Sequence, residues 1–321
     1  MASSTGNRWT DINLNVSDVK LAKSYNEIST KNIYIFFSFD LVGSTKFKTE
    51  KANWPYVISY FYDIVYKDLK TKIPQIKVWK YLGDEVLLYV SISDFESKSI
   101  IYDIPNMVFD TQLKVAEYVQ KKAKSKKIDV KSTIWIAGAK TVELEKLNNN
   151  SSIPQADKNY KNLRVKLNVE NQDQEQIDFI GPDMDTGFRV AKFAFHHKVV
   201  LSADFAYLLY KMSEKKDDKI DDNLQIVSYE ILKGVWDEQY YPIVWYYPHW
   251  DTAPYGLFYA DHKKNDIAER VLSERTDPIN KLTQVYEDLG KIAEIDAFVN
   301  ECDRVNSSKE RDFLLHLETR K

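Results

Sequence analysis

Residues 33–46 read IYIFFSFDLVGSTK, an apolar stretch that runs into an aspartate and then into a short turn containing glycine. Six of the seven residues from Ile33 to Phe39 are Ile, Tyr or Phe, and a run this short without helical period predicts a strand buried on both faces. Asp40 then lies at the rim of a core, where an unpaired carboxylate is costly and needs hydrogen bonds, a cation or water. The plainer interpretation of this stretch is a strand end with a capping Asp.

The turn after Asp40 is the second feature of this stretch. Residues 42–45, VGST, permit a tight turn, and free backbone N–H groups at such a turn favour phosphate. Ser44 or Thr45 is also expected to cap the next helix, which the apolar spacing places from about Trp54 to Lys70.

Composition restricts the classes of protein. The chain has 321 residues, 44% hydrophobic and 29% charged, which predicts a globular protein of one large or two ordinary domains. A formal net charge of -3 gives no general attraction to nucleic acid or anionic lipid. The single cysteine, Cys302, excludes an internal disulfide and a Cys-rich zinc site. Because no signal-peptide core and no apolar run of about 20 residues is present, we expect no membrane partner and a cytoplasmic location.

A second acidic residue is placed by a hairpin. The β-rich runs Ile76–Leu82 and Glu85–Ile92 flank Gly83-Asp84, a pair typical of a two-residue hairpin turn. Asp84 therefore lies at a hairpin tip, where Asp is also an ordinary turn residue. If the first strand lies beside this hairpin, Asp40 and Asp84 converge.

The remaining segments predict the fold class. Strand, helix, hairpin, helix and strand follow one another, which is the order of an α+β fold with helices packed on a mixed sheet. A polar insertion is expected at 142–176, and a helix after Gly181-Pro182 places Asp185 and Arg189 as an exposed i, i+4 pair. The other expected segments are an N-terminal arm (1–30) with a helix at 17–28, a helix at 104–124, strands at 131–141 and 198–202, a helix at 203–212, a hairpin at 225–247, and a C-terminal helical extension (248–321) with helices at 278–300 and 307–319.

In this order the segments resemble the catalytic domain of the class III nucleotide cyclases, over about residues 30–247. The resemblance implies a ferredoxin-like cyclase domain at 31–247. FSFDLVGSTKF resembles the family's first metal-aspartate motif and KYLGDEVLLY the second. The other matching segments are STIWIAGA for the following strand, IDFIGPDMDTGFRVAKFA for the helix that carries an Asn and an Arg, and VVLSADFAYLL and ILKGVWDEQYYPIVWYY for the closing segments.

The resemblance implies a two-metal cyclisation of a nucleoside triphosphate, with Mg²⁺ or Mn²⁺ as the cations. Asp40 and Asp84 would hold both metals, and the carbonyl of Leu41 would complete one site. The residues implied to cradle the triphosphate through their amides are Val42, Gly43, Ser44 and Thr45.

Three further residues receive catalytic or phosphate-binding roles from the resemblance. Arg189 would stabilise negative charge on the α-phosphoryl group, and Lys233 would contact a distal phosphate. Asp185 stands where the family has Asn, and an ionised acid accepts a hydrogen bond from a ribose hydroxyl but cannot donate one.

The substrate and the partners are also expectations from the resemblance. Lys80 and Asp178 stand at the base-reading positions, and they suit adenine as well as a pyrimidine. The bulky aromatics Trp54, Tyr81 and Trp135 near the motifs favour the smaller base. The whole is most similar to the pyrimidine cyclases of bacterial Pycsar antiphage systems, which implies cyclic UMP, or else cyclic CMP, acting on a separate effector.

In this family the metal ligands and the arginine helix come from opposite partners, so a chain with one cyclase unit implies a homodimer with two shared sites. The alternatives are an adenylate cyclase, another palm-type enzyme, and a catalytically inactive cyclase-like binding or dimerisation module.

Overall fold

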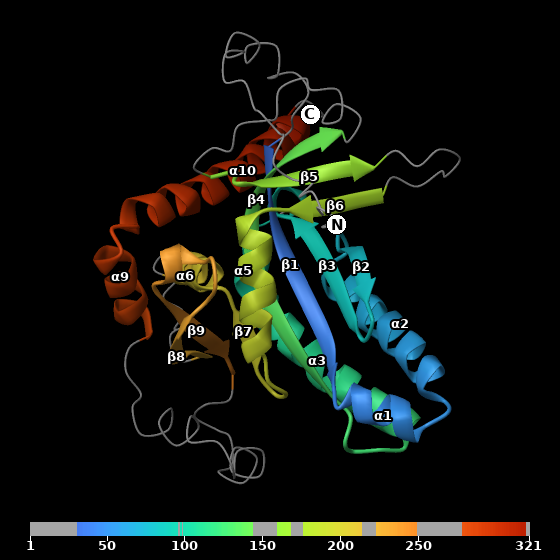
Figure 1. The fold of residues 1–321 in the computed structure, drawn as a ribbon. Coiled ribbons are helices and arrows are strands. Elements are labelled where there is room, and N and C mark those ends of the chain that lie inside the picture. Colours follow the sequence, from blue (N-terminus) through green and yellow to red (C-terminus); the bar gives the residue numbers. More distant parts are fainter. Residues whose placement is uncertain are drawn as a thin grey trace, which may run out of the picture.

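A long central strand, β1 (Lys31–Val42), runs through the middle of a mixed sheet (Figure 1). The computed structural model describes residues 31–95, 97, 99–143, 159–167, 176–213, 223–248 and 278–318, so the predicted arm at 1–30 and its helix lie outside the described residues. The strands that follow β1 are β2 (Lys77–Leu82), β3 (Glu85–Ser91), β4 (Asp129–Glu143), β5 (Asn162–Leu167), β6 (Gln176–Ile180), β7 (Val199–Leu201), β8 (Leu224–Ile231) and β9 (Tyr240–Tyr246). The helices are α1 (Ser44–Glu50), α2 (Trp54–Lys72), α3 (Ser99–Ala123), α5 (Pro182–Val190), α6 (Ala203–Ser213), α9 (Pro278–Asp288) and α10 (Ile292–Glu318), with short 3-10 turns at η3 (Ile92–Asp94), η4 (Ala191–Phe193) and η6 (Trp236–Glu238).

The strand order confirms the predicted fold class. The path through the sheet is β2-β3-β1-β4-β7-β9-β8, and β1 pairs antiparallel with both β3 and β4. The segment β1-α2-β2-β3-α3-β4 therefore has the ferredoxin-like arrangement, in which the first strand lies between the last strand and the hairpin. The end of β1 is thereby placed next to the hairpin turn, as the convergence of Asp40 and Asp84 requires.

Two cores lie on opposite faces of the sheet because side chains alternate along β1. Odd-numbered residues such as Ile35 and Phe37 enter the main core, which also includes apolar residues of α2 and α3. Even-numbered residues, Tyr34 and Phe36, enter a smaller aromatic core with Trp135 and Phe179. Figure 1 shows α2 and α3 behind the sheet and α5 in front of it. Asp40 continues the even-numbered series and lies on the α5 face.

The long strand β4 pairs with two strands on the side opposite β1. Its first half pairs parallel with β7, from Ser132 to Ile134, and its far end pairs parallel with β5, from Ala139 to Glu143. β5 lies within the range predicted to be a surface insertion, so part of that polar segment belongs to the sheet. The sequence NLRVKL shows only a short polar-apolar alternation, and its pairing partner is distant in the chain.

The C-terminal helices α9 and α10, predicted as an extension, pack on the domain that the sheet forms. Leu282, Tyr286 and Ile295 are buried in the main core. The hydroxyl of Tyr207 donates to Asp296 at 2.9 Å, which links α6 to α10. Along the described stretches of chain, no helix combines the length and apolar character needed to span a bilayer.

Candidate active site

The end of β1 carries the first predicted metal ligand. Asp40 lies across from Glu85 in the β1–β3 register and across from Lys131 in the β1–β4 register. The Lys131 Nζ atom lies 3.0 Å from Asp40 Oδ2. Burial nevertheless raises the pKa of Asp40, and the nearby negative charge of Asp84 adds to the effect while Lys131 opposes it.

The hairpin tip brings Asp84 to the same place. Gly83 takes a left-handed φ of 68°, and the Leu41 amide donates to the Asp84 carbonyl at 3.3 Å. The Asp84 side chain accepts hydrogen bonds from the Ser44 hydroxyl and from Lys48 Nζ, the latter at 2.9 Å. Desolvation raises the pKa of Asp84, but these hydrogen bonds outweigh it and leave the pKa below its usual value. Asp40 and Asp84 therefore converge.

A third carboxylate, Glu85, was not predicted as a site residue. It accepts a hydrogen bond from the Ser38 hydroxyl, which lies on the same face as Asp40. Burial raises the pKa of Glu85, and the charges of Asp40 and Asp84 raise it further. The position of Glu85, directly after Asp84 and opposite the end of β1, was a sequence signal that could have identified it. Lys48 and Lys131, which form ion pairs with Asp84 and Asp40, carried no such local signal. We call Asp40, Asp84 and Glu85 the carboxylate group.

The carboxylate group suits hard divalent cations. Carboxylate oxygens are the protein ligands that Mg²⁺ and Mn²⁺ prefer, and like charges held together at a protein surface are stabilised by a cation. In the chain alone, Lys48 and Lys131 supply that positive charge. The donor set therefore fits the predicted metals, while the ligand roles of Asp40, Asp84 and Leu41 stay predictions.

The predicted phosphate turn has a geometry that requires glycine. Gly43 has φ 76°, and a Cβ atom built on it would lie 2.5 Å from the Lys127 carbonyl oxygen. The expectation that Ser44 or Thr45 caps the helix at Trp54 is wrong, because a separate helix, α1, begins at Ser44 with Gly43 as its N-cap and no side-chain cap. The Ser44 hydroxyl instead donates a hydrogen bond to the Asp84 side chain, and Thr45 is exposed.

The predicted base-reading residues meet, although they are far apart in the sequence. Lys80 Nζ lies 2.5 Å from Asp178 Oδ1, and the same oxygen accepts the Trp79 indole N–H at 3.0 Å. Adjacent strand residues normally point to opposite faces, but an irregularity between Val78 and Lys80 in the β2–β3 register lets both Trp79 and Lys80 reach Asp178. The side chains of Lys80 and Asp178 are 33% and 40% exposed, so a ligand can reach them.

The aromatics expected to crowd the base are not placed as predicted. Trp135 is 1% exposed and stacks on Phe36 with ring centroids 5.3 Å apart, so it belongs to the aromatic core. Trp54 and Tyr81 are exposed. The aromatic side chain that adjoins the Lys80–Asp178 pair is Trp79, whose ring centroid lies 4.4 Å from Lys80 Nζ.

The predicted catalytic residues of α5 form a separate group. Arg189 Nη1 donates to the Asp185 carbonyl at 3.0 Å and lies 3.9 Å from an Asp185 carboxylate oxygen. A Cβ built on Gly234 would lie 3.9 Å from Arg189 Nη2, so the loop that carries the exposed Lys233 passes close to the guanidinium group. Within the described residues, no hydrogen bond or ion pair joins Arg189 to Asp40 or Asp84. Arg189 is therefore not joined by a polar contact to the carboxylate group in the described part of one chain.

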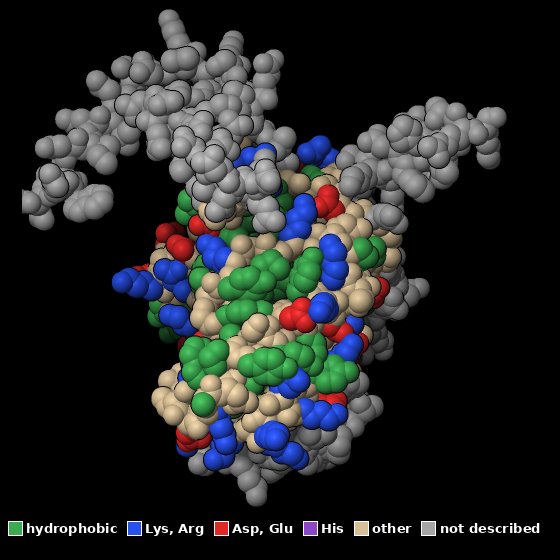
Figure 2. All heavy atoms as spheres, turned by 90° about the vertical axis from the view of Figure 1, so that its right-hand side faces the viewer, with side chains coloured by type: hydrophobic (Ala, Val, Ile, Leu, Met, Phe, Trp, Pro, Cys, Tyr) green, Lys and Arg blue, Asp and Glu red, His purple; other side chains and the backbone are tan. Residues whose placement is uncertain are grey.

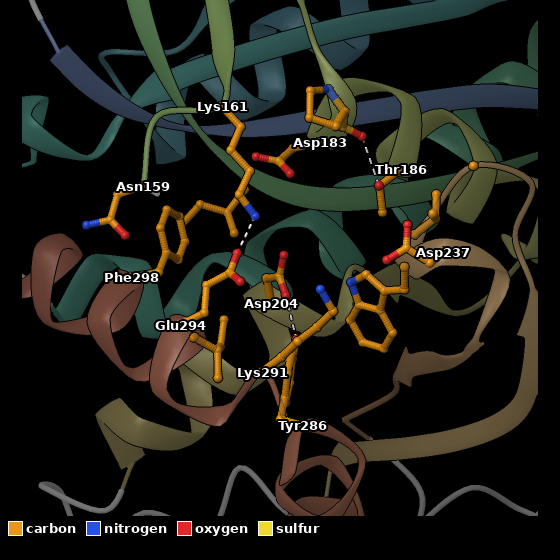
Figure 3. Close-up of a pocket in the computed structure, with 16 residues that line it drawn as sticks. Asn159, Lys161, Asp183, Thr186, Asp204, Asp237, Tyr286, Lys291, Glu294 and Phe298 are labelled. Atoms are coloured by element: carbon orange, nitrogen blue, oxygen red, sulfur yellow. Dashed lines mark hydrogen bonds and ion pairs between the residues drawn. The ribbon is translucent and has the colours of Figure 1, made fainter. Parts of the chain in front are cut away.

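A cavity of about 220 Å³ lies elsewhere, between α5, α6, the β8–β9 loop and the C-terminal helices (Figure 3). Figure 3 shows Lys161 and Glu294 pointing toward one another, and Tyr286 donates to Asp204 at 2.5 Å. Burial is the main cause that raises the pKa of Asp183 to about 6, and the negative charge of Asp204 adds to it. The cavity shares the helix α5 with Arg189 but no residue with the carboxylate group, and none of its lining residues was predicted as a site residue.

No protein-family model matches the sequence, and no curated protein matches it. Among solved structures, the adenylyl cyclase CyaB from P. aeruginosa aligns with a TM-score of 0.47 and 10% identity, over 68% of this chain and 94% of that chain. The guanylyl cyclase Cya2 aligns with a TM-score of 0.45 and 12% identity, over 68% of this chain and 92% of that chain. The guanylate cyclase domain of RhGC from Catenaria anguillulae, in complex with GTP, aligns with a TM-score of 0.44 and 11% identity, over 68% of this chain and 97% of that chain. The likeness is one of backbone at low identity, and it assigns no residue of this chain.

Proposed function

We propose that this protein is a nucleotide cyclase that converts a pyrimidine nucleoside triphosphate, UTP ahead of CTP, into the 3',5'-cyclic monophosphate and pyrophosphate. The observation that carries the proposal is the carboxylate group at the end of β1, directly beside the glycine turn at Gly43. Two convergent acids next to a turn with free amides suit a metal-bound triphosphate. The same placement disfavours an inactive cyclase-like module, which would have no reason to keep both acids.

The residues have distinct proposed roles. Asp40 and Asp84, with the Leu41 carbonyl, would hold two divalent cations, which when bound activate the attacking 3'-oxygen and neutralise charge on the leaving pyrophosphate. The amides of residues 42–45 would hold the triphosphate in place. Arg189 would stabilise charge on the α-phosphoryl group, Lys233 would contact a distal phosphate, and Asp185 would accept a hydrogen bond from the ribose.

The proposal includes a homodimer with two shared sites. Its support is that the described residues of one chain show no hydrogen bond or ion pair between Arg189 and the carboxylate group, whereas catalysis needs both at one phosphate. Exposed apolar side chains surround the hairpin and the start of α2: Tyr81 is 51% exposed, Leu82 44% and Tyr56 57%. Figure 2 shows the corresponding side of the molecule, with hydrophobic side chains gathered in its middle and lysine and arginine side chains around them. Such a surface suits a second copy of the chain.

The Lys80–Asp178 pair would contact the base, and the preference for a pyrimidine over adenine rests on the resemblance to the Pycsar cyclases. Asp178 Oδ1 already accepts from Lys80, Trp79 and the Phe179 amide, so Oδ2 remains to accept from a base N–H while Lys80 donates to a carbonyl. A base that offers no complementary donor and acceptor to these groups is disfavoured, because it displaces water from them without replacing its hydrogen bonds. An adenine can also use the pair, so cyclic AMP as the main product would replace the pyrimidine proposal with the adenylate alternative.

Product analysis tests the reaction and the substrate. Purified protein given equal UTP, CTP, ATP and GTP with Mg²⁺ or Mn²⁺ should form mainly cyclic UMP, or else cyclic CMP, by chromatography. Asp40→Asn and Asp84→Asn should abolish turnover without unfolding the protein. Asp63→Asn is the matched control, because Asp63 is an exposed aspartate of α2 paired with Lys67. Wild-type turnover by either of the first two variants would refute the assignment.

Mixing two inactive variants tests the shared site. Asp40→Asn and Arg189→Ala are each expected to be inactive, and together they should recover activity because a mixed dimer contains one intact site. If the subunits exchange, as shown by a tag pull-down, and activity stays absent, the shared site is wrong.

We also propose, from the resemblance to the Pycsar cyclases, that the product is a messenger in antiphage defence that activates a separate effector. Cyclic pyrimidine nucleotide should then rise in phage-infected cells that make the protein and not in cells that make Asp40→Asn. Equal levels in both cultures would count against this role.

A further inference from the structure

Two consecutive histidines and an aspartate meet at the beginning of β4. Asp129, His196 and His197 are the one group of three His, Cys, Asp or Glu side chains, among the residues that the structure describes, whose possible ligand atoms all lie within 4.8 Å of one another. Asp129 is the first residue of β4, and the two histidines precede β7, which pairs parallel with β4. Sixty-six positions or more of sequence separate the aspartate from the histidines, so the sheet alone brings them together.

The backbone turns both imidazoles to the same side. His197 has φ 61°, in the left-handed region that a non-glycine residue adopts at an energetic cost. In an extended strand, His196 and His197 would point to opposite faces. Here the two rings lie with centroids 5.1 Å apart and at 76° to each other, and His196 also stacks on Phe195 at 4.1 Å. A conformation that is costly and yet makes two ligand-type side chains converge indicates a binding role.

The spacing fits a metal ion better than a hydrogen bond. His197 Nε2 lies 3.7 Å from Asp129 Oδ2, which is too long for a hydrogen bond. Ligands of a tetrahedral ion with bonds of about 2.1 Å lie about 3.4 Å apart, so a shift of a few tenths of an ångström suffices. The other oxygen of Asp129 accepts the Val130 amide at 2.7 Å, which orients the carboxylate.

We propose that Asp129, His196 and His197 bind a divalent transition-metal ion, with Zn²⁺ as the ion that fits best. Two imidazole nitrogens and one carboxylate oxygen are a common zinc ligand set, and they leave a fourth position for water or another ligand. The side chains of His197 and Asp129 are 35% and 17% exposed, so the ion reaches the site from solvent.

This site is separate from the carboxylate group and does not depend on the proposed function. Lys131 lies between the two sites: it forms an isolated bridge with His196 and an ion pair with Asp40. The donor sets also differ, because imidazole selects zinc-like ions whereas an all-oxygen site selects Mg²⁺. A bound ion would tie the start of β4 to the segment before β7 and so stabilise the parallel β4–β7 pair.

Metal titration of the full chain tests the site. Protein stripped with a chelator is titrated with Co²⁺ in excess Mg²⁺, and the visible absorption of four-coordinate Co²⁺ is followed and then displaced with Zn²⁺. We expect one ion per chain and a higher unfolding temperature with Zn²⁺. His197→Asn, chosen because Asn tolerates a left-handed φ, and Asp129→Asn should each weaken Zn²⁺ binding by about 100-fold or more. Asp63→Asn is the matched control for loss of an aspartate and should bind as the wild type does.

Two results would overturn the inference. One is a wild-type protein that retains no Co²⁺ or Zn²⁺ in excess Mg²⁺. The other is unchanged Zn²⁺ affinity in His197→Asn and Asp129→Asn proteins whose circular dichroism matches the wild type. Where that second result is found, loss of the ion in Asp84→Asn would show that the carboxylate group holds it.

Discussion

Replacing Asp183 by asparagine removes a buried carboxylate while keeping its hydrogen bond. Asp183 lies in the first turn of α5 and lines the cavity. Its Oδ2 accepts from Asn162 Nδ2 at 2.7 Å, and its backbone amide donates to Asn162 Oδ1 at 3.1 Å. An asparagine in the same place still offers an amide oxygen to Asn162 and carries no charge. The Asp183→Asn variant therefore isolates the cost of the buried charge.

The sign and size follow from the pKa of Asp183, which burial and the charge of Asp204 raise from 3.8 to about 6. The folded protein binds this proton more tightly than the unfolded chain does, so the free energy of unfolding falls as pH rises from about 4 to about 6. A shift of about two units corresponds to about 3 kcal/mol. The carboxylate is partly accessible because it faces the cavity, and water there reduces the effect to about 1–3 kcal/mol.

Urea unfolding at several pH values measures the difference. Above about pH 7, Asp183→Asn should be more stable than the wild type by about 1–3 kcal/mol, and the advantage should disappear near pH 4. Asp63→Asn, at an exposed position of α2, is the control for an Asp-to-Asn change. An Asp183→Asn protein that is less stable than the wild type at pH 8, or a difference that does not grow with pH, would refute the reasoning.

Three other substitutions test packing, a buried ion pair and the glycine turn. Gly187→Ala would place a Cβ 2.5 Å from the Trp135 ring, so we expect the free energy of unfolding, measured with urea, to fall by about 1–3 kcal/mol. Asp68 is a buried carboxylate. Desolvation raises its pKa, but hydrogen bonds from lysine side chains outweigh this effect and lower the pKa to about 2. Asp68→Asn should lower the free energy of unfolding by about 1–2 kcal/mol at pH 7, and the difference from the wild type should shrink as pH falls from about 4 toward 2. Gly43→Ala would be strained at φ 76° and would place a Cβ against the Lys127 carbonyl, so it should lower turnover in the proposed cyclase reaction by about 100-fold without changing the substrate preference.

Much of the fold could be predicted because the signals are local. The apolar run at 33–39 predicted β1, and Gly83-Asp84 between two β-rich runs predicted the β2–β3 hairpin. The helix after Gly181-Pro182 was confirmed as α5, with Pro182 at its first position. Helix α1 was missed because seven residues carry little periodicity, and β5 was missed because its partner β4 lies in another part of the chain.

The candidate site divides in the same way. The proximity of Asp40 and Asp84 was predictable, because a strand end beside a hairpin tip follows from the order of elements. The cations Lys48 and Lys131 and the third acid Glu85 were not, since their places depend on the register between strands. The prediction that Trp135 lies near the base was wrong for the same reason. The alternation of side chains along a strand shows that a residue faces one side of the sheet, but it does not show which element covers that side.

The sequence by itself determined the elements that local patterns encode: the buried first strand, the acidic hairpin tip, the glycine turn and the order that makes an α+β sheet. Only the tertiary structure decided which distant groups meet. The irregularity in β2 that turns both Trp79 and Lys80 toward Asp178, and the left-handed φ of His197 that turns two histidines toward Asp129, are the two examples. The physical reason is that alternation and turn propensity act between near neighbours, whereas register, bulges and strained turns are set by the free energy of packing the whole sheet.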